Sequence, residues 1–90
     1  MTDEFVTQAA PAGRGLGVAA RWENVQTTRF YEATAQRNLF GEWEVLAVWG
    51  RIGSRRGGYQ CRPVADVACA AQLLDTIGRQ RARRGYVAAI

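Results

Sequence analysis

The sequence predicts an α+β fold: an antiparallel β-sheet of four to five strands with one long C-terminal α-helix packed on one face. Up to about residue 63, short apolar runs with strand-like alternation are separated by turns rich in glycine and asparagine. From about residue 64 the apolar period changes to 3.6 residues, which is typical of a helix with one buried face. Several strands followed by a single helix are the pattern of this fold class.

The first part of the chain divides into a leader and two strands. Residues 1–14 are rich in small and structure-breaking residues without a period, so we expect a flexible leader followed by a single domain over residues 15–90. Residues 16–22 alternate in polarity and predict the first strand. Residues 29–35 carry aromatic and threonine side chains and predict the second.

The middle of the chain predicts a turn, the strongest strand and a hairpin. Asparagine and glycine in residues 36–42 mark the turn. Residues 43–52 form the most apolar run, and the glycine-flanked residues 53–58 suit a hairpin loop. Residues 59–62 then begin a fourth strand that Pro63 ends or confines to an edge.

The C-terminal third predicts the helix. Asp66 near its start and arginines near its end match the helix dipole, and Gly85 is a natural stop. Residues 86–90 would add a short last strand or cover the edge of the core. The apolar face of the helix consists of Val67, Ala70, Leu73, Leu74 and Ile77.

The composition argues against an enzyme. The twelve basic residues are all arginine, with no lysine and no histidine, and the net charge is +4. Histidine acid–base catalysis, lysine Schiff bases and histidine-activated nucleophiles are therefore excluded. Cys61 and Cys69 are too few for a structural zinc site or a disulfide framework, so we expect two reduced thiols, no metal and no cofactor. No run approaches the ~20 apolar residues of a membrane span, and no secretory signal begins the chain, so we expect a cytoplasmic protein without a membrane partner.

The arginines are clustered along the sequence. Their shared identity is explained by GC-rich codons, so their positions carry the information. Residues 46–63 hold four arginines and residues 76–90 hold another four, and neither segment contains an acid. Clustered positive charge of this kind is the footprint of a protein that binds a polyanion.

The strand at residues 43–52 places an aromatic residue beside a cation. Leu46, Val48 and Ile52 are expected to face the helix. Trp49 and Arg51, two residues apart, would then project together from the uncovered face as a stacking platform with a phosphate fork.

Gly50 would leave an open backbone between these two side chains. The alternative interpretation is structural: Trp49 is a core residue and Arg51 pairs with Glu32, Glu42 or Glu44. The residues alone leave both interpretations open.

Residues 49–53, Trp-Gly-Arg-Ile-Gly, resemble the signature after which WGR domains are named. Residues 29–31, Arg-Phe-Tyr, are similar to the basic-aromatic-aromatic strand that precedes this signature in the family, and residues 83–86 are similar to its basic, glycine-containing close. The resemblance covers residues 16–88. It implies an antiparallel sheet with one helix, as found beside the catalytic domain of DNA-dependent poly(ADP-ribose) polymerases, in bacterial regulators and in small stand-alone bacterial proteins.

The resemblance also implies roles for single residues. Trp49 would pack on a terminal sugar, Arg51 would contact a phosphate or a neighbouring domain, and Arg29 would contact the nucleic-acid backbone. Arg83 falls near a basic DNA-contacting position at the helix end. Val48 stands where many members have a basic residue, which removes one phosphate contact, and a protein partner for Arg51 would have to act in trans.

We therefore expect a non-catalytic nucleic-acid-binding module for DNA ends, nicks or junctions, with low sequence specificity. A protein–protein interaction adaptor that uses the same face is the alternative. The sequence leaves the choice between DNA and RNA open, as well as the oligomeric state. The candidate nucleic-acid-binding residues are Trp49, Gly50, Arg51, Arg29, Arg55, Arg56, Arg62, Arg79 and Arg83.

Overall fold

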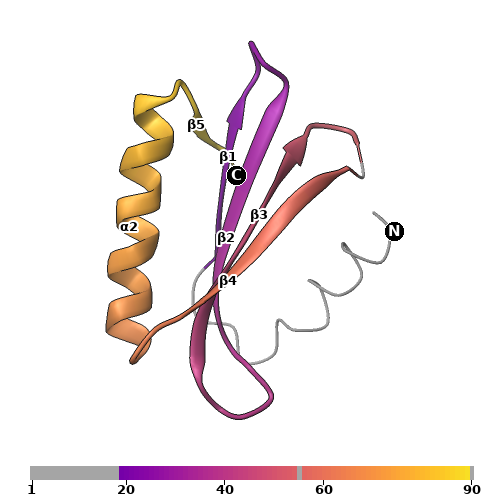
Figure 1. The fold of residues 1–90 in the computed structure, drawn as a ribbon. Coiled ribbons are helices and arrows are strands. Elements are labelled where there is room, and N and C mark those ends of the chain that lie inside the picture. Colours follow the sequence, from indigo (N-terminus) through magenta and orange to yellow (C-terminus); the bar gives the residue numbers. More distant parts are fainter. Residues whose placement is uncertain (1–18, 55, 90) are drawn as a thin grey trace.

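A five-stranded antiparallel sheet carries one helix on one face in a computed structural model of the chain (Figure 1). The structure describes residues 19–54 and 56–89. The sheet order is β4-β3-β2-β1-β5, and α2 packs against β1, β2 and β3, so the predicted fold class is confirmed. The elements are β1 (Ala19–Asn24), β2 (Arg29–Arg37), β3 (Trp43–Arg51), β4 (Gly57–Pro63), α2 (Val67–Arg83) and β5 (Val87–Ala89).

The observed strands differ from the predicted ones mainly at their ends. β2 continues to Arg37, and β4 begins at Gly57, inside the segment predicted as a loop. The apolar residues after the helix do form a short last strand, which pairs with β1. The predicted leader, residues 1–14, and the beginning of the predicted first strand lie outside the described residues. No helix within the described part of the chain is long and apolar enough to span a membrane.

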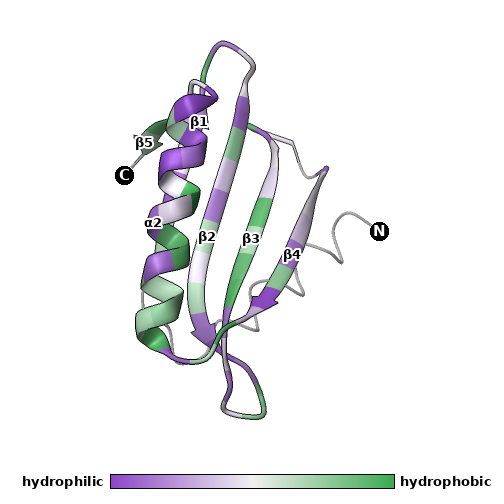
Figure 2. Ribbon diagram, turned by 60° about the vertical axis from the view of Figure 1, so that its left-hand side comes forward, coloured by the Kyte–Doolittle hydropathy of each residue, from purple (hydrophilic) through white to green (hydrophobic). Residues whose placement is uncertain are grey.

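The core lies between α2 and the sheet. Small alanines on β2 let the helix approach closely, and the apolar stripe of α2 faces the strands (Figure 2). Residues that are partners in an antiparallel register share a face, so the core residues of β2 and β3 identify the face that the helix covers. The buried cluster consists of Ala33, Ala35, Val45, Ala70, Leu74 and Ile77.

The predicted orientation of β3 is wrong. Val45 packs against the helix, and strand alternation therefore places Trp49 on the helix face and Leu46 on the opposite face. The error has a physical cause. Val45, Leu46 and Ala47 are all buried, so β3 is apolar on both faces and its alternation does not mark the core side.

The ends of α2 are fixed by specific hydrogen bonds. The Asp66 carboxylate accepts a hydrogen bond of 2.9 Å from the backbone N–H of Cys69, which caps the first turn and lowers the pKa of Asp66. At the other end Gly85 adopts φ +87°, and the N–H of Tyr86 donates to the carbonyl of Arg81 at 3.0 Å. This Schellman arrangement reverses the chain and returns Tyr86 over the last turn of the helix.

Asn24 ties the end of the helix to the β1–β2 turn. Its amide donates to the carbonyl of Arg84 at 3.2 Å, and its Oδ1 accepts from the N–H groups of Gln26 and Thr27 at 3.0 and 3.2 Å. The residue is only 8% exposed. The C-terminal end of α2, the β1–β2 turn and the β3–β4 connection lie at the same end of the molecule (Figure 1).

Candidate nucleic-acid interface

An aromatic pair on β2 and β3 forms the floor of the candidate site. Tyr31 and Trp49 are direct partners in the register, and their rings stack with centroids 5.9 Å apart and an interplanar angle of 14°. Trp22 on β1 is the partner of Tyr31 on the other side, tilted by 56° at 6.2 Å. Trp49 is half-buried, so part of its surface is still available to a ligand.

Two glycines allow close packing around this tryptophan, Gly58 against the indole itself and Gly50 between β3 and the start of β4. Gly58, the partner of Trp49 on β4, lies under the indole, and a Cβ there would sit 2.8 Å from Cζ2 of Trp49. Gly50 is buried, and a Cβ on it would lie 2.5 Å from the carbonyl oxygen of Arg56. The prediction that Gly50 leaves an open backbone is therefore wrong, because the glycine is required where β4 approaches β3 closely. Its backbone still borders the cavity described below.

Arg81 is sandwiched between two tyrosines. Its Cζ lies 4.4 Å from the ring centroid of Tyr31 and 5.2 Å from that of Tyr86, both favourable cation–π distances. The Nε atom is buried without a hydrogen-bond partner. The return of the chain after Gly85 supplies one side of this sandwich, and β2 supplies the other. The C-terminal end of α2 therefore places the Arg81 guanidinium against the aromatic floor of the site.

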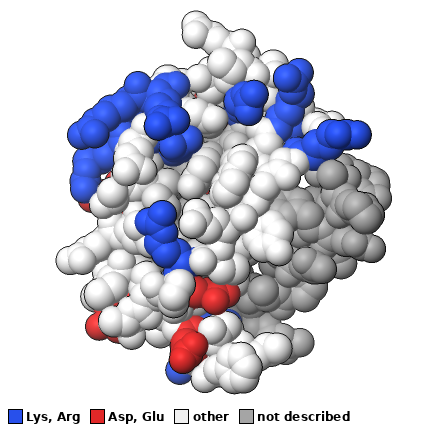
Figure 3. Space-filling model, viewed as in Figure 1, with Lys and Arg blue, Asp and Glu red and all other residues white. Residues whose placement is uncertain are grey.

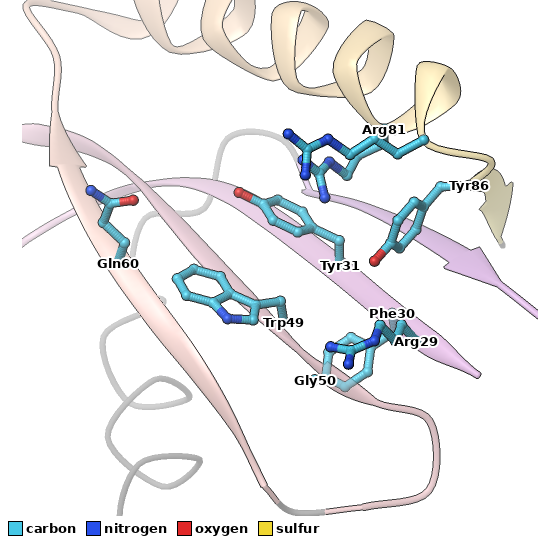
Figure 4. A pocket seen from close by; sticks show the side chains of 9 residues that line it. Arg29, Phe30, Tyr31, Trp49, Gly50, Gln60, Arg81 and Tyr86 are labelled. Carbon is cyan, nitrogen blue, oxygen red and sulfur yellow. The ribbon is translucent and has the colours of Figure 1, made fainter. Parts of the chain in front are cut away.

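These groups line one open cavity of about 460 Å³ at the end of α2 (Figure 4). Stacking rings form its floor, three arginines surround them, and its lining contains no acid. Planar rings with guanidinium groups offer stacking together with forked hydrogen bonding to phosphate. The lining residues are Arg29, Phe30, Tyr31, Trp49, Gly50, Gln60, Arg81, Arg84 and Tyr86.

On the face shown in Figure 3, the charges of the described residues are unevenly distributed. Most arginines on the face shown in Figure 3 gather toward the end that holds the cavity, and the acidic side chains lie toward the opposite end. Within residues 19–54 and 56–89, only two arginines form ion pairs with acids. Arg21 pairs with Glu23 and Glu32, and Arg79 pairs with Asp75. The arginines of the cavity keep their charge available for a ligand.

The structure brings together part of the predicted set. Trp49, Gly50 and Arg29 line the cavity, whereas the exposed Arg51 lies opposite Arg29 at its edge. Arg56 is exposed just before β4.

The other predicted arginines lie elsewhere. Arg62 lines a smaller neighbouring cavity, and Arg79 is engaged by Asp75 and by the hydroxyl of Thr76. Arg83 is exposed, and one turn of helix separates it from Arg79, so both lie on the outer side of α2. Arg55 lies outside the described residues.

The sequence did not identify six of the residues that line the cavity: Phe30, Tyr31, Gln60, Arg81, Arg84 and Tyr86. A signal for Tyr31 is present in the sequence. The observed hairpin is centred on Phe40, and an antiparallel register about that residue pairs Tyr31 with Trp49. Arg81 reaches the site because α2 covers the face of the sheet that carries Tyr31. The sequence does not show which face α2 covers, because β3 is apolar on both faces.

The surroundings of Cys61 disfavour its thiolate form. Desolvation of its sulfur and the nearby Glu44 carboxylate raise the pKa of the Cys61 thiol, although the residue as a whole is exposed. A thiol with a raised pKa is a poor nucleophile at neutral pH. In the described part of the chain, no cluster of three or more cysteine and carboxylate side chains could hold a metal ion.

The fold and the site define a small α+β domain with an aromatic-arginine surface at one end of its helix. A family profile described as the WGR domain matches residues 20–89, and the chain belongs to this family. Such a domain is non-catalytic by itself. Comparison with curated proteins and with solved structures found no significant match.

Proposed function

We propose that this WGR domain binds DNA at ends, nicks or junctions, with low sequence specificity. WGR domains serve as nucleic-acid-binding modules in poly(ADP-ribose) polymerases, which supports the proposal. The observation that carries it is the stacked Tyr31–Trp49 pair, which shares one acid-free cavity with Arg29, Arg81 and Arg84.

The shape of the site favours an interrupted strand over a continuous one. The cavity is hollowed beside the end of α2 and has the size of a small-molecule pocket, so a terminal sugar and phosphate fit better than the unbroken backbone of a duplex. Trp49 stacks on the terminal sugar or base, and the arginines neutralise the phosphates. Phosphate contacts position a protein on DNA without reading its bases, so low sequence specificity follows.

A protein-binding adaptor is the second candidate, because tryptophan, tyrosine and arginine are also the residues that dominate protein interfaces. The two functions differ in their salt dependence. Displacement of counterions from DNA makes binding fall steeply as salt rises, with a slope close to the number of phosphates contacted.

A titration of the full chain tests the proposal. The ligands are one duplex in nicked, blunt-ended and covalently closed form, together with the single strand, each at two salt concentrations. We expect the nicked and blunt forms to bind more tightly than the closed duplex, with affinity falling as salt rises. Equal affinity for the nicked and closed forms contradicts the preference for interruptions. The adaptor function is favoured by two results together. None of the four DNA ligands binds at low salt, and a pull-down resistant to nuclease retains a protein partner that the Trp49→Ala variant loses.

A further inference from the structure

A second cavity of about 100 Å³ adjoins the first and shares Tyr31 and Gln60 with it. It lies beside α2, between the helix and strands β3 and β4. Val45 and Ile77, which are buried, and Ala47 and Leu73 form its apolar part. The two cavities therefore adjoin at Tyr31 and Gln60. In the first cavity Gln60 stands across from Tyr31 and Trp49 (Figure 4).

The rim of the second cavity is polar and lacks acids. The side chains of Gln60 and Gln80 form no hydrogen bond with any of the described residues. Arg62 forms no ion pair with any of the described acids. A carboxamide offers both donors and acceptors, which matches the edge of an unpaired nucleobase. An apolar surface bordered by amides and one guanidinium thus suits a base with its attached phosphate.

We propose that the groove between α2 and β4 receives a single-stranded nucleotide that extends from the DNA end held in the first cavity. The inference rests on the proposed function and narrows the ligand class to ends with an overhang or flap. The base of the extension lies at the mouth of the groove against Leu73, the half-buried aliphatic residue of its lining. Its edge bonds to Gln60 and Gln80, and Arg62 contacts its phosphate. Continuity with the first cavity and the positive rim favour this occupant over a peptide.

Duplexes that differ only at their ends test the inference. Blunt, 5′-overhang and 3′-overhang forms with one or two extra nucleotides are titrated against the full chain at one low salt concentration. One overhang polarity is expected to bind about fivefold or more tightly than the blunt form, because the groove adds apolar and hydrogen-bond contacts to one nucleotide.

Gln80→Leu is the diagnostic variant, because Gln80 lines only the second cavity and is exposed on the helix. It should lose the gain from the overhang and keep the affinity for the blunt duplex. Gln72→Leu, the same change at an exposed helix position that lines neither cavity, should keep both. Arg62→Gln should reduce the gain as well, and circular dichroism confirms that each variant folds.

The outcomes separate the two proposals. If the wild-type protein binds all three duplexes equally, or Gln80→Leu retains the overhang gain, the groove inference is overturned while end binding stands. If no duplex binds, the proposed function fails and the groove inference fails with it.

Discussion

Arg29 and Arg51 lie directly opposite each other in the β2–β3 register, at the strand ends beside the cavity. Like charges at directly opposed positions destabilise a sheet. Neither arginine forms an ion pair with an acid among the described residues. A polyanion bound between them would relieve the repulsion, as the proposed DNA binding requires.

Arg51→Gln should weaken DNA binding and slightly stabilise the protein. Loss of one phosphate contact should reduce the slope of log affinity against log salt by roughly one. Loss of the repulsion should raise the free energy of unfolding by about 0.2–1 kcal/mol at low salt. Binding titrations across a salt series and thermal unfolding measure the two effects.

Arg37→Gln is the matched control, since Arg37 lies at the far end of β2. It should leave the salt slope unchanged. A slope that is equally unchanged in Arg51→Gln would show that Arg51 contacts no phosphate.

Trp49→Ala should lower the affinity for a nicked duplex by about 1–3 kcal/mol, because a stacking surface is lost. The salt slope should stay the same, since no charge is removed. Trp49→Phe keeps an aromatic ring next to Tyr31 and should recover part of the affinity. Unaltered binding of the alanine variant, in a protein that still unfolds cooperatively, contradicts the stacking role.

Gly58→Ala should displace the indole of Trp49, since the new Cβ would lie within 2.9 Å of three indole atoms. Crowding of this kind costs roughly 1–3 kcal/mol of stability, and we expect weaker DNA binding as well. A double-mutant cycle with Trp49→Ala identifies the route. If Gly58 acts through Trp49, the double variant binds no more weakly than Trp49→Ala alone, whereas additive losses point to an independent effect.

Asn24→Asp should destabilise the protein, although it only replaces the side-chain amide with a carboxylate. The carboxylate keeps the acceptor for Gln26 and Thr27 but loses the amide that donates to the Arg84 carbonyl. The loss of this part-buried hydrogen bond costs about 0.5–1.5 kcal/mol, and the new carboxylate also repels the Arg84 carbonyl. Chemical denaturation measures the loss, and stability equal to the wild-type value would show that this hydrogen bond contributes nothing.

Asp66 should make stability depend on pH at the acid end. Hydrogen bonding from the Cys69 N–H lowers the pKa of Asp66 in the folded state, so its cap contributes above the ordinary pKa and is lost as pH falls through the lowered one. Thermal unfolding of Asp66→Asn should retain most of the neutral-pH stability, because asparagine also caps helices, and show a weaker acid dependence. An identical acid profile in both proteins would assign the effect to other carboxylates.

Much of the fold was predictable because local signals agreed with one another. The start of α2 beside Asp66, its stop at Gly85 and the burial of Ala70, Leu74 and Ile77 are confirmed, whereas Val67 of the predicted apolar face is exposed. The orientation of β3 was not predictable, because the strand is apolar on both faces. Only packing against α2 distinguishes them.

The candidate site was predicted only where local sequence motifs mark its residues. Trp49 and Arg29 belong to recognisable motifs and do line the cavity. Arg81 belongs to the site because of where α2 packs and because the chain reverses after the helix. No local sequence pattern indicates either feature.

The cation held between Tyr31 and Tyr86 is a guanidinium, as is every basic side chain of the sequence. Guanidinium groups stay protonated at every pH that a cell reaches. The chain contains no histidine and no lysine, so nothing in its basic set titrates near neutrality. Acidification of a compartment would therefore leave the basic charge of this surface unchanged, and with it the phosphate binding proposed above. Ionic strength and competing polyanions are the variables to which it responds.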